Sequence, residues 1–198
     1  MDSFVFFAVA YLLAAGAPGT DTMLIVSRTI VGGKSSAIRY ALGIALAKTT
    51  MVSLAFFGAG SLLSANPGLL TLLKWLGAGF LIFMAVRLLF AKPKTTEQTN
   101  RSTAASVIGG YLVGISNPQP LMFYASIVPT VVADGLTGWG DLLVLWLIVI
   151  LGFALITLFY MSIAQFANRW ISRSENRVLV NRVMAGVFLI IALVIVTR

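Results

Sequence analysis

The sequence contains no cysteine and no histidine. Disulfides, thiol redox chemistry, haem ligation by His and His/Cys zinc sites are therefore excluded, and so is a proton relay through imidazole. Acidic residues are also few, with 6 Asp and Glu against 14 Lys and Arg. Because no cluster of acids, His or Cys is available for chemistry, we expect no catalytic residues, no metal site and no cofactor.

Apolar residues dominate what remains. They make up 59% of the 198 residues, and the mean hydropathy is +0.98. Charged residues make up only 10%, so the chain cannot cover its surface with polar groups and lipid must be its main solvent. The net charge of +8 lies mostly in short links between apolar runs, which suits anionic lipid rather than nucleic acid. The sequence thus predicts an all-α integral membrane protein.

Six apolar segments follow one another along the chain, at about 3–31, 36–63, 68–91, 104–133, 139–167 and 178–197. Each is long enough for a membrane helix, which needs about 20 residues. The first is expected to be a retained helix rather than a signal peptide, because the start Met1-Asp2-Ser3 is not basic. Turn residues at 32–35 should separate the first two segments. The polar stretch 92–103 is predicted to be a cytoplasmic linker.

The two halves of the chain repeat one pattern. Segment 1 is interrupted at Pro18 and segment 4 at Pro118, and in each half one long segment and one of ordinary length follow. Three spans per repeat force the second copy to enter the membrane upside down. Paired broken segments are typical of inverted-repeat transporters, whose site lies where the breaks meet. We predict six transmembrane helices as two inverted three-helix repeats, at 1–91 and 104–198, with helices 1 and 4 broken.

The positions of the basic residues predict the orientation. With six spans and the N-terminus outside, eleven of the 14 Lys and Arg residues fall on the cytoplasmic side: Arg28, Lys34, Arg39, Arg87, Lys92, Lys94, Arg101, Arg169, Arg173, Arg177 and Arg182. Lys74 and Arg198 fall outside, and Lys48 lies within a segment. The positive-inside rule therefore favours both termini outside.

The stretch "AAGAPGTDTMLIV" at residues 14–26 contains the first break. Pro18 and Gly19 interrupt the helix, and Thr20 or Asp21 is expected to cap a new half-helix. In hydrocarbon such a break survives only where protein or a water-filled cavity surrounds it.

The second break, Asn117-Pro118-Gln119-Pro120, should begin another half-helix with Asn117 as its cap. Both half-helix N-termini are expected to offer free N–H groups and a positive dipole end to an anionic group. The freed carbonyl groups and Asp21 suit a cation. The alternative is that both breaks are proline kinks with satisfied caps.

Asp21 and Lys48 are the ionisable residues that lie deepest in the apolar segments. An ammonium at that depth costs about 2.5–3.5 kcal/mol, so Lys48 should face the interior and find a partner. Three roles stay open for it: an ion pair with Asp21, a contact to a substrate carboxylate, or proton coupling. Asp21 itself is either a functional carboxylate or a capping residue. Small residues on the same segment, Gly43, Ala47 and 58–60, are expected to serve helix packing.

These motifs resemble those of LysE-type amino-acid exporters, the lysine and threonine/homoserine efflux family. The stretch at 14–47 resembles the N-terminal signature, "LKWLGAGFLIFMAVRLL" the third segment, and "GISNPQPLMFYASIVPTVV" the fourth. The Pro-Gly-x-Asp motif falls on Pro18, Gly19 and Asp21, and the Asn-Pro motif on Asn117 and Pro118. Two positions depart from the family pattern. Lys48 stands where the family is usually small or uncharged to acidic, and Gln119 replaces a frequent Lys.

The resemblance implies a multi-pass exporter of amino acids or their derivatives in the bacterial cytoplasmic (inner) membrane, driven by proton antiport. A zwitterionic substrate suits a pocket formed where the two breaks meet, with Asp21, Lys48, Thr20 and Asn117 as the binding or coupling residues and Pro18, Gly19, Pro118 and Pro120 as the helix breaks. The expected partners are this small molecule, protons and membrane lipid, and a homo-oligomer is compatible with the sequence. An ion or metal exporter of related architecture and a non-transporting membrane scaffold are the alternatives.

Overall fold

Helices make up all the regular structure in the described part of the chain. The computed structural model describes residues 3–16, 19–65, 67–90, 107–164, 166 and 174–197. The helices are α1 (Ser3–Gly16), α2 (Thr20–Ala65), α3 (Pro67–Leu89), α4 (Val107–Ile115), α5 (Pro118–Ala133), α6 (Trp139–Ser162) and α8 (Ser174–Thr197). The predicted linker at 92–103 lies outside the described residues.

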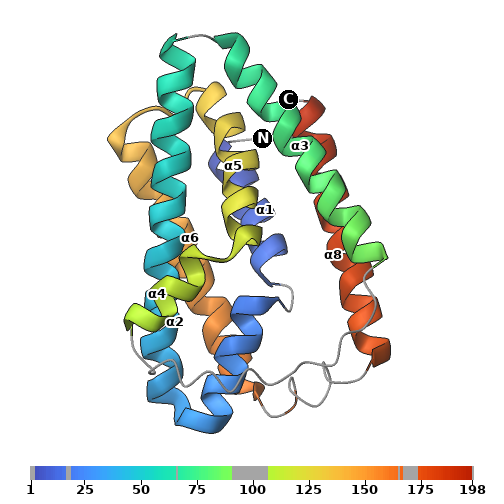
Figure 1. Ribbon diagram of the computed structural model, residues 1–198. Helices are drawn as coiled ribbons and strands as arrows, with labels where there is room; N and C mark the ends of the chain where they lie inside the picture. Colours follow the sequence, from blue (N-terminus) through green and yellow to red (C-terminus); the bar gives the residue numbers. More distant parts are fainter. Residues whose placement is uncertain are drawn as a thin grey trace.

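Helix α2 is broken at Gly33, where φ is 74° and ψ is 171°. A positive φ of this size is readily adopted only by glycine, so a single residue reverses the chain where the sequence predicted a turn. Figure 1 shows the result: residues 20–32 run to one end of the bundle, and residues 34–65 run back past them to the other end.

The chain crosses the bundle repeatedly in alternating directions (Figure 1). Helix α1 and residues 20–32 run the same way, in succession, whereas α4 and α5 run in succession in the opposite direction. The short helix α1 packs on the long helix α6, and the short helix α4 packs on α2. Helices α3 and α8 pack on each other along one side of the bundle. The start of α1 and the end of α8 lie in the same half of the molecule (Figure 1).

The contact between α2 and α4 is made by backbone. A Cβ atom added at Gly43 would lie 1.9 Å from the Val107 carbonyl oxygen, and one added at Gly110 would lie 2.0 Å from the Tyr40 carbonyl oxygen. The predicted packing role of Gly43 is therefore confirmed. The same prediction is wrong for Gly58, where an added Cβ meets no described atom within 4 Å. That glycine lies on an exposed face of α2.

Within the described residues, two helical stretches are long and apolar enough to cross a membrane: Thr20–Ser61, which includes the reversal at Gly33, and Trp139–Ser162. Helix α6 exposes a row of leucines at Leu147, Leu151, Leu155 and Leu158 while it buries Leu145 and Val149. An apolar row spaced by three or four residues on the outside of a bundle suits contact with lipid.

Candidate functional site

The first break places Gly19 directly before α2. The Gly19 carbonyl accepts the first helical hydrogen bond from Met23 N at 2.9 Å, so Gly19 is the N-terminal cap. The Thr22 hydroxyl accepts a hydrogen bond from Gly19 N at 2.8 Å and donates one to Gly19 O at 3.0 Å. The expectation that Thr20 or Asp21 caps the helix is wrong, because both lie in its first turn. Pro18 lies outside the described residues.

The second break has the predicted cap. Asn117 lies in extended backbone, its side-chain oxygen accepts a hydrogen bond from Gln119 N at 3.1 Å, and Pro118 begins α5. Asn117 N in turn donates to Gly114 O at 3.1 Å. Pro118 and Pro120 have no N–H group. The expected free N–H groups at this helix end are therefore absent, because two are replaced by proline and the others are already bonded.

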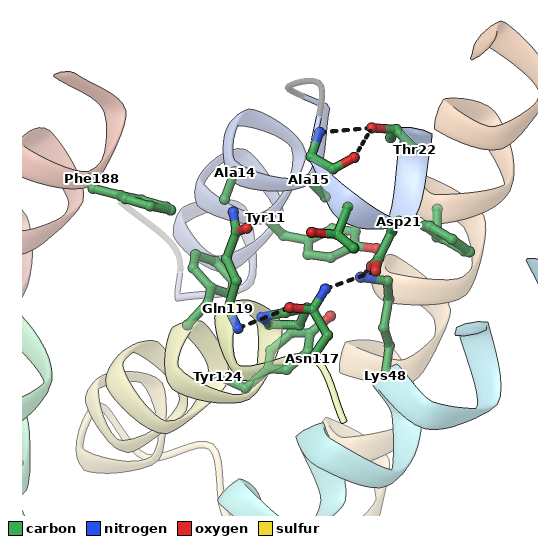
Figure 2. Close-up of a pocket in the computed structure, with 15 residues that line it drawn as sticks. Tyr11, Ala14, Ala15, Asp21, Thr22, Lys48, Asn117, Gln119, Tyr124 and Phe188 are labelled. Atoms are coloured by element: carbon green, nitrogen blue, oxygen red, sulfur yellow. Dashed lines mark hydrogen bonds and ion pairs between the residues drawn. The ribbon is translucent and has the colours of Figure 1, made fainter. Parts of the chain in front are cut away.

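Asp21, just after the first break, contacts the second break and the returning part of α2 through its two carboxylate oxygens. Its Oδ2 atom lies 2.6 Å from Lys48 Nζ, and its Oδ1 atom accepts a hydrogen bond from Asn117 Nδ2 at 2.9 Å. Figure 2 shows these three side chains pointing toward one another. Asp21 and Lys48 are only 8% and 4% exposed. The predicted ion pair between Asp21 and Lys48 is thus present. The hydrogen bond from Asn117 links this pair to the second half of the chain.

A cavity opens beside this cluster. It offers about 50 Å³ to the centres of water molecules, whereas one water needs about 10–15 Å³. Its polar lining includes Thr20 and Gln119 as well as the charged cluster, and Pro120 contributes to the wall. The cavity therefore has room for several waters or for the polar end of a small molecule, with the ion pair at its side.

Aromatic side chains from four helices form much of the remaining wall: Tyr11, Phe123, Tyr124, Phe153 and Phe188. The Lys48 ammonium lies 5.0 Å from the centre of the Phe153 ring, within the range of a cation–π contact. Tyr11 stacks on Tyr124 with 6.3 Å between ring centres. One side of the cavity is thus charged and the other apolar.

No local pattern in the sequence marks these aromatic residues as part of the site. Each lies in an apolar helix, where an aromatic ring has no local feature that separates a cavity wall from ordinary core packing. In the sequence, Gln119 departs from the family pattern, and in the structure its side chain reaches the cavity (Figure 2). Its position next to the Asn-Pro cap was the one signal available for it.

Comparison with known proteins assigns the chain to a family. The model of the LysE type translocator family matches residues 12–198. The chain belongs to this family. This chain is 28% identical over 170 residues to the uncharacterized membrane protein YrhP of Bacillus subtilis. The aligned region covers 80% of this chain and 81% of that protein. The chain is 23% identical over 188 residues to an uncharacterized membrane protein of Vibrio cholerae, covering 91% and 92% of the two chains.

A relative with a named activity is more distant. The leucine efflux protein of Salmonella choleraesuis is 23% identical over 113 residues, which cover 55% of this LysE type translocator and 53% of the relative. No solved structure matches the chain. Members of the family are transporters, so this membrane protein is a transporter and not an enzyme.

Proposed function

We propose that this LysE type translocator exports amino acids or their derivatives across the bacterial cytoplasmic membrane. The observation that carries the proposal is the buried cluster of Asp21, Lys48 and Asn117 beside a cavity, at the point where the two helix breaks meet. An amino acid carries an ammonium and a carboxylate on one carbon atom. A cluster with one carboxylate and one ammonium has a partner for each.

The broken helices belong to the same proposal. Helices α1 and α4 have 14 and 9 residues, or about 21 and 14 Å at 1.5 Å per residue. Neither length covers a hydrocarbon core of about 30 Å. Each reaches the needed length only together with the helix that follows its break, which favours breaks near the midplane.

We further propose two inverted three-helix repeats, at 1–91 and 104–198, joined by a cytoplasmic linker at 92–103, with six spans in all. Two observations support this arrangement. The chain runs in opposite directions through the two breaks (Figure 1). The short helix of each half packs on the long helix of the other, α1 on α6 and α4 on α2.

In the proposed proton antiport, the same cluster of Asp21, Lys48 and Asn117 would couple proton movement to substrate movement. Protonation of Asp21 removes its charge and with it the attraction that holds Lys48 at 2.6 Å. The proton and the ammonium group of a substrate would thus compete for one carboxylate, which is the exchange that an antiporter requires. Asn117 would hold that carboxylate in place during the exchange, and Thr20 borders the cavity on the side of the first break.

The test is efflux of preloaded amino acids from proteoliposomes under an imposed proton gradient, normalised to inserted protein. We expect Asp21→Asn to insert and fold but to lose gradient-driven export. Asp134→Asn, which changes an exposed carboxylate bonded to Ser3, is the matched control and should keep it. Wild-type export by Asp21→Asn would remove this carboxylate from the mechanism.

The breaks are tested in the same assay. Pro18→Ala and Pro118→Ala should each impair export more than thermal stability, because a continuous helix would close over the cavity. Normal export by both proline variants would remove the breaks from the proposal.

A further inference from the structure

The charges of the side chains that line the cavity sum to zero. Among its described lining residues, Asp21 is the one acid and Lys48 the one base, and they are paired with each other. The second oxygen of Asp21 is bonded to Asn117. The empty site is therefore electrically neutral and has its charges satisfied from within the chain. A substrate that binds to these charges must first separate the pair.

A substrate carboxylate has one charged partner among the described residues of this cavity, although the first turn of α2 at residues 20–22 also lines it. The N-terminal end of α5 cannot bind it through N–H groups, because Pro118 and Pro120 have none and Gln119 N is bonded to the Asn117 side chain. Lys48, which is 4% exposed, is the one cation among the described lining residues. The Gln119 side chain lines the same space and can donate a weaker, neutral hydrogen bond.

The rest of the described wall has polar groups, such as the Tyr124 hydroxyl, but no ionised side chain that could balance a further charge. Phe123, Phe153 and Phe188 are each at most 5% exposed, and together with Tyr11 and Tyr124 they form the aromatic part of the cavity wall. A second positive charge on a substrate would meet Lys48 with no additional acid to balance it. A second negative charge would meet Asp21 in the same way. Both would be buried without a counter-ion, which is costly in a membrane interior.

We propose, as an extension of the proposed function, that Lys48 is a built-in counter-ion that selects zwitterions with a neutral, apolar side chain. The substrate splits the resident pair: its ammonium takes the place of Lys48 at Asp21 Oδ2, and its carboxylate moves to Lys48 Nζ. One ion pair becomes two, and the net charge of the site stays zero. The apolar side chain then lies against the aromatic wall, and the site rejects cationic and anionic amino acids.

Leucine and leucinamide provide the matched pair of probes, because they differ only in the carboxylate that Lys48 is proposed to bind. Uptake into proteoliposomes is measured for both, and for lysine and glutamate, at about pH 6, where the leucinamide ammonium is charged. We expect wild-type protein to prefer leucine over each of the other three by at least about tenfold, a difference of about 1.4 kcal/mol. This measurement needs no variant.

Substitution of Lys48 then tests its role directly. Lys48→Met keeps an unbranched side chain, one atom shorter, but leaves Asp21 without its cation, so we expect the preference to reverse in favour of leucinamide. Lys48→Arg keeps the charge and should keep the preference for leucine. Equal transport of leucine and lysine by wild-type protein, or an unchanged preference for leucine in folded Lys48→Met, would overturn the inference and leave amino-acid export standing. If wild-type protein moves no amino acid of a full panel, the proposed function itself fails.

Discussion

Replacement of Gly43 by alanine tests the close approach of α2 and α4. The added Cβ would lie 1.9 Å from the Val107 carbonyl oxygen and 2.5 Å from Tyr111 N. Both are backbone atoms of α4, so no side chain can rotate away, and the two helices must separate by about 1 Å or more to restore van der Waals contact. Overpacking of this kind costs about 1–3 kcal/mol. For a chain of this size each kcal/mol lowers Tm by about 2–4 °C.

The matched control lies on the same helix. Gly58→Ala meets no described atom within 4 Å, and alanine favours a helix over glycine by up to about 1 kcal/mol. We therefore expect Gly43→Ala to melt about 2–12 °C below wild type, and Gly58→Ala to melt at or above it. Melting is followed by tryptophan fluorescence of detergent-solubilised protein. Gly110→Ala, whose Cβ would lie 2.0 Å from the Tyr40 carbonyl oxygen, should behave like Gly43→Ala. If Gly43→Ala and Gly58→Ala melt together, the helices do not meet through backbone.

Three further predictions concern the charged cluster, the contact between α2 and α6, and the topology. Lys48→Met should lower Tm more than the double variant with Asp21→Asn, because the single change leaves a buried charge unpaired; additive losses would argue against direct pairing. Trp146→Phe removes the 3.0 Å hydrogen bond from the indole to Ser53, and we expect a loss of about 1 kcal/mol in stability, measured by the same melting. In this cysteine-free chain, an impermeant thiol reagent on intact cells should label a cysteine introduced at Ser3 but not one at Thr96, and labelling of the second would refute the six-span orientation.

The sequence alone determined the features that depend on neighbouring residues or on the solvent. The composition required a membrane, because too few polar residues exist to cover a surface in water. The Asn-Pro dipeptide predicted the cap and first residue of α5, since capping depends on the side chain beside the helix end. The pairing of Asp21 with Lys48 was one of the three roles that the sequence left open for Lys48, and it was predictable because an isolated charge in apolar surroundings needs a partner.

Only the tertiary structure decided what those residues face. Gly43 and Gly58 look alike in the sequence, but one contacts another helix and the other is exposed. Asn117 reaches Asp21 across 96 residues of chain, and the aromatic wall is assembled from four helices. Contacts of this kind depend on how the helices are rotated and how they cross, and neither can be deduced from the chemistry of individual residues. The N–H groups at the start of α5 are another example. A helix N-terminus predicts hydrogen-bond donors, but whether they are available depends on the bonds that the folded chain already makes to them.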